Sequence, residues 1–176
     1  MKNKNVFYQI IAFISLILFN ACETIPTGAK AIKPFDVNKY LGTWYEVARM
    51  DFKYERDLKN VTATYSLNAD GTIKVLNQGY DINTNERKQA NGKAKFVDLS
   101  DEAKLKVSFF GPFYAGYNVV ALDKDYKYAL VAGQDLDLMW ILSREKTIPE
   151  DIKAEYLKVA EQIGYKTSEL IWVVQE

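Results

Sequence analysis

Hydrophobic and polar positions alternate along most of the chain after residue 40. In residues 61–67, every odd position is Val, Ala, Tyr or Leu, and every even position is Thr or Ser. A period of two places the apolar side chains on one face of a β-strand and the polar ones on the other. We therefore predict a half-buried strand here, and the turn residues at 68–71 predict a hairpin directly after it.

Similar segments follow one another along the chain and predict eight strands in sequence. Besides 61–67 they lie at residues 42–50, 72–81, about 90–96, 105–109, 115–123, 126–134 and 138–145, with Gly79 as a candidate bulge. Most connections are short, which favours antiparallel neighbours closed on themselves to remove the two edges. The predicted fold is all-β, an eight-stranded antiparallel up-and-down barrel. A β-sandwich, which has similar turn spacing, is the alternative.

One segment after the eighth strand has helical periodicity. Thr147 and Glu150 are spaced as in a capping box, and Gly164 is a helix stop. Between them, apolar residues form a stripe at helical spacing: Ile152, Tyr156, Val159, Ala160 and Ile163. We predict one α-helix that packs this stripe on the outside of the barrel, and a short final strand at residues 170–174.

The first 34 residues have a different character. Lys2 and Lys4 precede an apolar run at 6–19, which is shorter than the roughly 20 residues that a membrane-spanning helix needs. Small residues follow at Ala21 and Cys22, so we predict a secretory signal at residues 1–21, with a retained anchor as the alternative. Residues 22–34 are predicted to be a tether, and residues 35–176 the barrel domain.

Residues 19–22 resemble a bacterial lipobox, although Phe19 and Asn20 depart from its usual pattern. The resemblance implies that Cys22 becomes the acylated first residue of the mature chain, anchored by acyl chains such as palmitate. A secreted protein with an unmodified cysteine is the alternative. Glu23 stands where Asp would have suggested the inner membrane. We therefore expect the outer membrane, on its periplasmic or its surface side.

Composition narrows the function. Lys plus Arg and Asp plus Glu number 23 each, which indicates no basic surface for nucleic acid. The chain has no histidine, so Ser–His catalysis and histidine metal sites are excluded. Its single cysteine cannot form a disulfide within the chain. We predict no catalytic residues, no metal and no cofactor.

Three short motifs resemble the lipocalin family. Gly42 and Trp44 form a Gly-x-Trp signature, Asp125 and Tyr126 an acidic-Tyr turn, and Arg144 is a basic residue after the eighth strand. Bacterial outer-membrane lipocalins are similar over residues 40–49, 61–65, 106–113 and 140–144. The resemblance implies that Trp44 lies at the closed end of the barrel with the Arg144 guanidinium across its ring, a structural contact.

The inward faces of the predicted strands combine small and aromatic residues, as expected for a ligand pocket. The predicted lining residues are Ala63, Tyr65, Val75, Phe96, Phe109, Tyr117 and Trp140. Glu46 shares the parity of Trp44; it is either a polar contact for a ligand or a side chain satisfied by its neighbours. Lys53, Arg56 and Lys59, in the long first loop, either meet an anionic head group or are simply solvated.

The family resemblance implies a fatty acid or lysophospholipid ligand, and a task in lipid storage, transport or membrane maintenance. A structural lipoprotein that binds a partner through its outer surface is one alternative, and a lipid-modifying enzyme is another. Homodimers occur among bacterial relatives, but the sequence does not locate such an interface.

Overall fold

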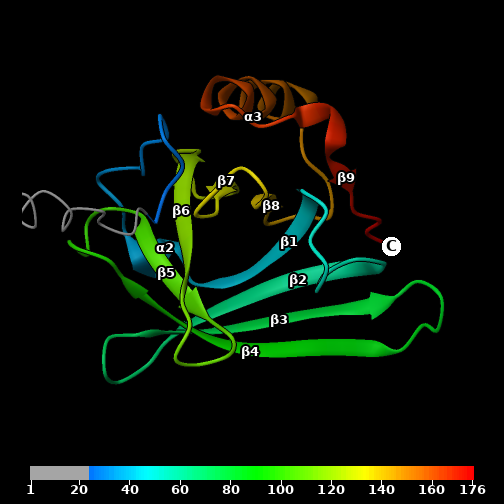
Figure 1. Ribbon diagram of the computed structural model, residues 1–176, viewed down its shortest axis with the longest axis horizontal. Coiled ribbons are helices and arrows are strands. Elements are labelled where there is room, and N and C mark those ends of the chain that lie inside the picture. The colour runs from blue at the N-terminus through cyan, green and yellow to red at the C-terminus, as the bar shows by residue number, and fades with distance from the viewer. Residues whose placement is uncertain (1–23) are drawn as a thin grey trace, which may run out of the picture.

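A computed structural model describes residues 24–176, so Cys22 and the predicted signal at 1–21 lie outside the described residues. Eight antiparallel strands follow in chain order, and β1 pairs with both β8 and β2, which closes the barrel (Figure 1). The eight-stranded barrel is confirmed, and the sandwich is excluded. The strands are β1 (Gly42–Arg49), β2 (Leu58–Leu67), β3 (Ile73–Asp81), β4 (Arg87–Phe96), β5 (Lys104–Ser108), β6 (Ala115–Leu122), β7 (Tyr128–Ala132) and β8 (Met139–Ser143).

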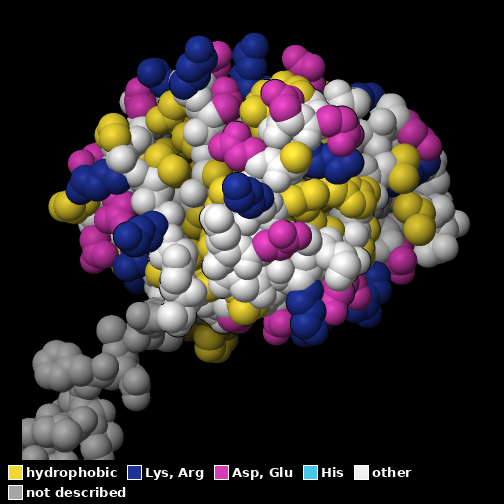
Figure 2. All heavy atoms as spheres, turned by 90° about the horizontal axis from the view of Figure 1, so that it is seen from above, with side chains coloured by type: hydrophobic (Ala, Val, Ile, Leu, Met, Phe, Trp, Pro, Cys, Tyr) yellow, Lys and Arg dark blue, Asp and Glu magenta, His cyan; other side chains and the backbone are white. Residues whose placement is uncertain are grey.

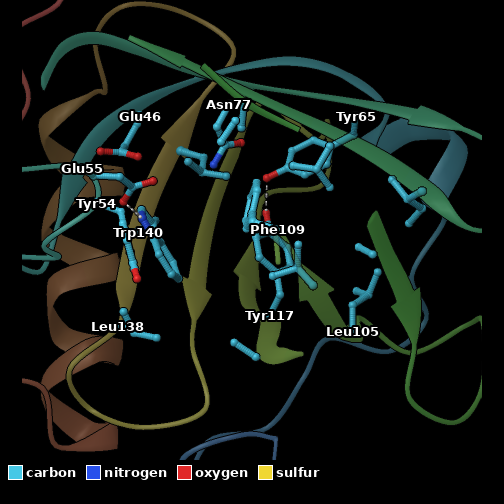
Figure 3. A pocket seen from close by; sticks show the side chains of 18 of the residues that line it. Glu46, Tyr54, Glu55, Tyr65, Asn77, Leu105, Phe109, Tyr117, Leu138 and Trp140 are labelled. Carbon is cyan, nitrogen blue, oxygen red and sulfur yellow. Dashed lines mark hydrogen bonds between the residues drawn. The ribbon is translucent and has the colours of Figure 1, made fainter. Parts of the chain in front are cut away.

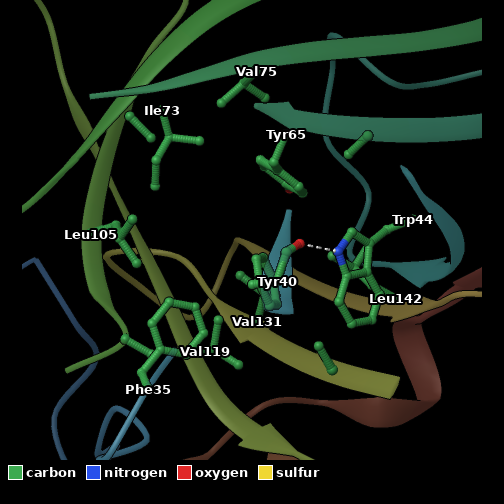
Figure 4. Close-up of a cluster of buried hydrophobic side chains, with 14 residues drawn as sticks. Phe35, Tyr40, Trp44, Tyr65, Ile73, Val75, Leu105, Val119, Val131 and Leu142 are labelled. Carbon is green, nitrogen blue, oxygen red and sulfur yellow. Dashed lines mark hydrogen bonds between the residues drawn. The ribbon is translucent and has the colours of Figure 1, made fainter. Parts of the chain in front are cut away.

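The barrel wall separates two apolar cores. The inner one gathers around Trp44, Tyr65 and Val131 (Figure 4). The outer one lies between the wall and α3 (Glu150–Ile163), which covers β7, β8 and β1 (Figure 1). Tyr156 and Ala160 of the predicted helical stripe are buried there. Alternate side chains of the wall therefore pack into the inner core and into the outer core, which accounts for the alternation in the sequence.

The start of α3 differs from the prediction. Its N-cap is Pro149, which offers no side-chain hydrogen bond, and Thr147 instead accepts a hydrogen bond from the Ser143 hydroxyl at its backbone oxygen. The capping box is wrong because the residue before a proline is disfavoured in the helical conformation, so the helix cannot begin before Pro149. Gly164 ends it as predicted, with a left-handed φ of 114°. The final strand β9 (Ile171–Trp172) pairs with β1.

Bulges interrupt the pairing of β1, β2 and β6, and those in β1 and β2 lie beside residues that line the cavity. Pairing with β8 skips Val47, between Glu46 and Ala48, so that Glu46 and Arg49 are both buried. Parity counted from Trp44 would have placed Arg49 outside. In β2, Asn60 and Val61 together lie opposite Gly79. The predicted bulge is therefore present, with its extra residue in β2.

Residues 24–34 run along β6, with Ile25 and Ala29 packed against the outer core and Ile32 against the inner one. The Asn118 side-chain amide donates to the Thr24 carbonyl at 2.6 Å, and the Ile32 amide donates to the Val119 carbonyl at 2.8 Å. The Ala103 amide in turn donates to Ile32, at 2.9 Å. From Thr24 onward, the segment predicted as a tether is part of the folded domain, because its backbone groups find partners on β6.

The surface carries no single sign of charge on the face that α3 occupies, where basic and acidic side chains are interspersed (Figure 2). This agrees with the balanced composition of the chain. Among residues 24–176, no helix is both long enough and apolar enough to span a membrane.

Candidate functional site

The barrel encloses a cavity of about 460 Å³ that reaches the end formed by the β1–β2, β3–β4, β5–β6 and β7–β8 loops. We call this end the mouth. Phe52 and Tyr54 of the first loop and Phe110 and Phe113 of the third border it. The opposite end is closed by Phe35, the short helix α2 (Val37–Tyr40) and Trp44. One open and one closed end make a sleeve for an elongated molecule.

Six of the seven predicted lining residues border this cavity. They are Ala63, Tyr65, Val75, Phe109, Tyr117 and Trp140. Phe96 does not, and that prediction is wrong. It is the last residue of β4, and its ring packs 6.4 Å from that of Phe35, below the cavity at the closed end. Parity gives a side chain's direction but not its depth.

Three tyrosine hydroxyls form a chain at the inner end of the cavity. The Tyr117 hydroxyl shares a hydrogen bond with Tyr65 at 2.8 Å (Figure 3) and another with Tyr40 at 2.7 Å. Burial raises the pKa of all three phenols above the ordinary value, so each stays neutral at physiological pH. The cavity therefore has a neutral polar group at its inner end.

A charged cluster lies on one wall of the cavity. The Arg49 guanidinium donates to the Glu46 carboxylate at 2.8 Å and to the Glu55 carbonyl at 2.6 Å. The Trp140 indole donates to the Glu55 carboxylate at 2.9 Å (Figure 3). Both carboxyl groups border the cavity. The sequence left two interpretations of Glu46 open, a polar contact for a ligand or a side chain satisfied by its neighbours. In the structure its carboxylate is bonded by Arg49, and the residue also borders the cavity.

The cluster holds two carboxyl groups and one guanidinium, and only the Glu46 carboxylate is paired with that guanidinium. Burial, and then the proximity of Glu55, raises the pKa of Glu46 well above the ordinary value, which Arg49 opposes without cancelling. Burial also raises the pKa of Glu55, opposed by the Trp140 hydrogen bond and by Arg49. One positive charge compensates one carboxylate, so the second is driven towards its protonated form.

Asn77 is a polar group that sequence reasoning missed. It lines the cavity from β3, and among residues 24–176 its buried Oδ1 has no hydrogen-bond partner. A buried acceptor of this kind can receive a hydroxyl hydrogen from a ligand. An asparagine within an alternating strand carries no signal that distinguishes a lining residue from an exposed one.

The closed end has the geometry implied by the motifs. The Arg144 guanidinium carbon lies 3.8 Å from the centre of the Trp44 ring. The Trp44 indole donates to the Tyr40 carbonyl at 2.8 Å (Figure 4). Gly42 has a φ of 93°, and a Cβ there would lie 3.4 Å from Arg144. Gly42, Trp44 and Arg144 hold the base of the barrel and are not among the residues that border the cavity.

In the acidic-Tyr turn, Asp123 makes the supporting contacts. Its carboxylate accepts the amides of Asp125, Lys127 and Tyr128, whereas no such contact is found for the Asp125 side chain among residues 24–176. The Tyr126 hydroxyl accepts the Asp36 amide at 2.9 Å and so ties the turn to α2.

Lys53 and Arg56 of the first loop do not border the cavity, and neither does Lys59, which the structure places in β2. Arg56 pairs with Asp51 at 2.7 Å and Lys59 with Glu176 at 2.8 Å, while Lys53 lies over the Tyr54 ring. Lys88 of β4 borders it instead, near the mouth. Among residues 24–176, no group of three or more His, Cys, Asp or Glu side chains could hold a metal ion.

Comparisons with known proteins agree with this geometry. Residues 35–175 match the model of the family described as "Lipocalin-like domain". The chain is 49% identical over 168 residues to "Outer membrane lipoprotein Blc" of Escherichia coli K12, covering 94% of this chain and 95% of that protein. The Vibrio cholerae protein of the same name is 44% identical, covering 95% and 98%.

More distant proteins share the fold. "Temperature-induced lipocalin-1" of Arabidopsis thaliana is 35% identical, with 80% of each chain covered. The crystal structure of the cockroach allergen Per a 4 superposes with a TM-score of 0.67 at 24% identity, covering 88% of this chain and 96% of that one. Insecticyanin of the tobacco hornworm Manduca sexta gives 0.68 at 18% identity, covering 85% and 86%.

Proposed function

The chain belongs to the lipocalin family, and from this premise we propose that it is a lipid-binding lipoprotein of the outer membrane that holds a fatty acid or a lysophospholipid in its barrel. The observation that carries the proposal is the cavity itself. It has about 460 Å³ of space, bordered mainly by apolar and aromatic side chains, and one end is open. That volume is within the range of small-molecule sites.

The chemistry of the wall favours an acyl chain. Burial contributes about 0.8 kcal/mol per methylene, so ten buried methylenes would contribute about 8 kcal/mol before the cost of ordering the chain. We place the acyl chain along Val75, Phe109 and Trp140, with the polar head towards the mouth, where Lys88 lies. The free acceptor on Asn77 supports a ligand hydroxyl, which a lysophospholipid has and a fatty acid lacks.

The membrane part of the proposal depends on the N-terminal sequence and on the relatives. Proteins named outer membrane lipoprotein match 94–95% of this chain. We propose that residues 1–21 are removed as a signal and that Cys22 is acylated. Several acyl chains on one residue would give stable anchoring, where a single chain gives only marginal binding.

The family assignment places the protein among binding proteins and not among enzymes. The potentially reactive carboxyl groups in the cavity, Glu46 and Glu55, are engaged with Arg49 and Trp140. A homodimer remains an expectation from the sequence, without a located interface.

Tryptophan fluorescence tests the ligand. Protein beginning at Thr24, which keeps the segment that packs along the barrel, is titrated with lysophospholipid and separately with fatty acid. We expect a saturable change with one site per chain, because Trp140 borders the cavity. Trp140→Phe should remove most of the change. Trp172→Phe, on the outer strand β9, should keep it.

The two lipids and the two variants separate the outcomes. A larger response to lysophospholipid would favour the ligand that donates to Asn77. Absence of a saturable response to either lipid from a folded protein would contradict lipid binding in the barrel. A response that survives Trp140→Phe would locate the lipid elsewhere.

A further inference from the structure

The N-terminal segment joins the barrel close to its mouth. The Thr24 carbonyl is held by Asn118, and it lies so close to Gly116 that a Cβ there would be 1.9 Å from the carbonyl oxygen. Gly116 is the second residue of β6, directly after the β5–β6 loop, and Gln134, of the β7–β8 loop, lies beside it. Both loops border the mouth, so the chain leaves the folded domain at this end.

Covalent geometry then limits where an acylated residue 22 lies. Two residues span at most about 7 Å, so an anchor on Cys22 lies within that distance of Thr24. From Gly116, β6 continues for six residues, roughly 20 Å along the strand, to Leu122 at the closed end, so two residues of chain do not reach that end. A short attachment at one end keeps that end next to the membrane.

The mouth carries the exposed aromatic residues that such a contact would need. Tyr54, Phe110, Phe113 and Tyr114, here called the aromatic rim, expose 60%, 65%, 78% and 39% of their surface. Tyr54 and Phe110 come from different loops, yet their ring centres are only 5.9 Å apart, so they form one patch. A continuous exposed apolar patch indicates an interaction surface.

Lysines stand directly behind these rings. The Lys53 ammonium lies 4.7 Å from the centre of the Tyr54 ring, and that of Lys95 lies 4.9 Å from Tyr114. Aromatic rings with lysines behind them suit a membrane interface, because the rings enter the head-group region while the ammonium groups meet lipid phosphates. Asp135 and Asp137 flank Leu136 in the β7–β8 loop, so that loop is less suited to insertion.

From the exit point of the chain and the aromatic rim, we infer that the barrel stands mouth-down on the phospholipid bilayer that holds its anchor. The aromatic rim lies in the head-group layer, and the cavity opens onto the lipid. A lipid can then pass between bilayer and barrel without crossing water. This inference rests on the proposed acylation of Cys22.

Brominated lipids test the orientation, because bromine on the upper part of the acyl chains quenches a tryptophan whose ring lies at or just beneath the head-group layer. The full-length chain is expressed in a bacterium, purified in its processed form, and reconstituted into phosphatidylethanolamine–phosphatidylglycerol vesicles with brominated acyl chains. Phe113→Trp adds a probe to the aromatic rim. Leu67→Trp is the matched control, since Leu67 is 49% exposed and ends β2 at the closed end.

We expect most of the emission added by Phe113→Trp to be lost in brominated vesicles, and that added by Leu67→Trp to remain. The native tryptophans are common to both variants, so quenching of Trp140 by a lipid inside the cavity cancels in the comparison. Equal behaviour of the two probes, or quenching of the closed-end probe alone, would overturn the orientation. Shielding of Phe113→Trp from acrylamide without bromine quenching would show that a second protein copy covers the rim, which would also overturn it.

A mass measurement distinguishes failure of the proposed acylation from failure of the orientation. The mass of the processed chain reports whether Cys22 is acylated. An unmodified Cys22 would overturn the anchor and the orientation together, but not lipid binding in the barrel. An acylated protein whose two probes behave alike would overturn only the orientation.

Discussion

The guanidinium of Arg144 covers the ring of Trp44 at 3.8 Å and closes the base of the barrel. It also donates to the carbonyls of Leu41 and Thr43, at 2.8 Å each. One side chain therefore joins the end of β8, the start of β1 and the segment between α2 and β1. A structural contact of this kind should affect stability and leave the cavity unchanged.

Arg144→Ala should lower the free energy of unfolding by about 2–4 kcal/mol, because the cation–π contact and several charged hydrogen bonds are lost at a partly buried site. Urea denaturation measures this. Arg56→Ala, which removes only an exposed pair with Asp51, should have little effect. Unchanged stability of Arg144→Ala would show that the contact is incidental.

Much of the barrel could be predicted because its wall is regular. Alternation fixes the face of each strand wherever pairing is uninterrupted, and this placed Ala63, Tyr65 and Trp140 correctly on the cavity side. It fails at bulges, which carry no strong sequence signal. The skipped residue in β1 hid the burial of Arg49, and with it the charged cluster.

Long-range contacts account for the remaining differences. Thr24 and its neighbours are small and polar enough to resemble a linker, yet they are held by Asn118, 94 residues away. Lys88 lies near the mouth because β4 is longer than the apolar pattern indicated, beginning at Arg87. Neither contact is encoded in the local pattern of the segment that makes it.

Gly116→Ala should detach the start of the N-terminal segment. A Cβ at this position would lie 1.9 Å from the Thr24 carbonyl oxygen, and another backbone atom, the Gln134 Cα, is 3.1 Å away, so the segment has to move. Hydrogen exchange should become faster in residues 24–32 and stay unchanged in β2 and β3. Gly111→Ala, which meets nothing within 4 Å, is the control. Equal protection in the two variants would contradict the docking of this segment.

The stability of the protein should fall as pH rises above about 4.3, the ordinary pKa of glutamate. The pKa of Glu46 and that of Glu55 are raised by burial, so the folded state binds more protons than the unfolded state in this range. Unfolding therefore releases protons, and the free energy of unfolding decreases as the pH rises until the raised pKa values are passed.

Glu55→Gln should flatten that dependence, because it removes one carboxyl group with a raised pKa and also the neighbouring charge that raises the pKa of Glu46. Urea midpoints between pH 4 and pH 8, compared with those of the wild type, provide the measurement. Glu150→Gln, at an exposed position on α3, should retain the wild-type slope. A slope that is the same in Glu55→Gln as in the wild type would rule out shared protonation in the cavity.

Tyr117→Phe should cost about 1–3 kcal/mol of stability, because it removes the hydroxyl that joins the other two and leaves buried groups unpaired. Tyr65→Phe should cost less, since Tyr117 would still be paired with Tyr40. Tyr54→Phe, at the exposed mouth, serves as the control. Thermal or urea denaturation orders the three variants, and a larger cost for Tyr65→Phe than for Tyr117→Phe would contradict the central position of Tyr117.

Lys88→Gln should weaken binding of a fatty acid more than binding of a zwitterionic lysophospholipid. Lys88 borders the cavity near the mouth, at the inward parity of β4, and its ammonium is shared with the exposed carboxylate of Glu86 at 2.8 Å. An exposed and already paired charge contributes modestly, so we expect a loss of roughly two- to five-fold for the fatty acid. Fluorescence titrations at low salt measure the affinity for each lipid.

Lys93→Gln is the matched control on the same strand, because Lys93 has the opposite parity and pairs with Asp70. A selective loss in Lys88→Gln would place the carboxylate at the mouth, whereas equal affinity for the fatty acid in both variants would favour a carboxylate buried beside the Tyr117 hydroxyl.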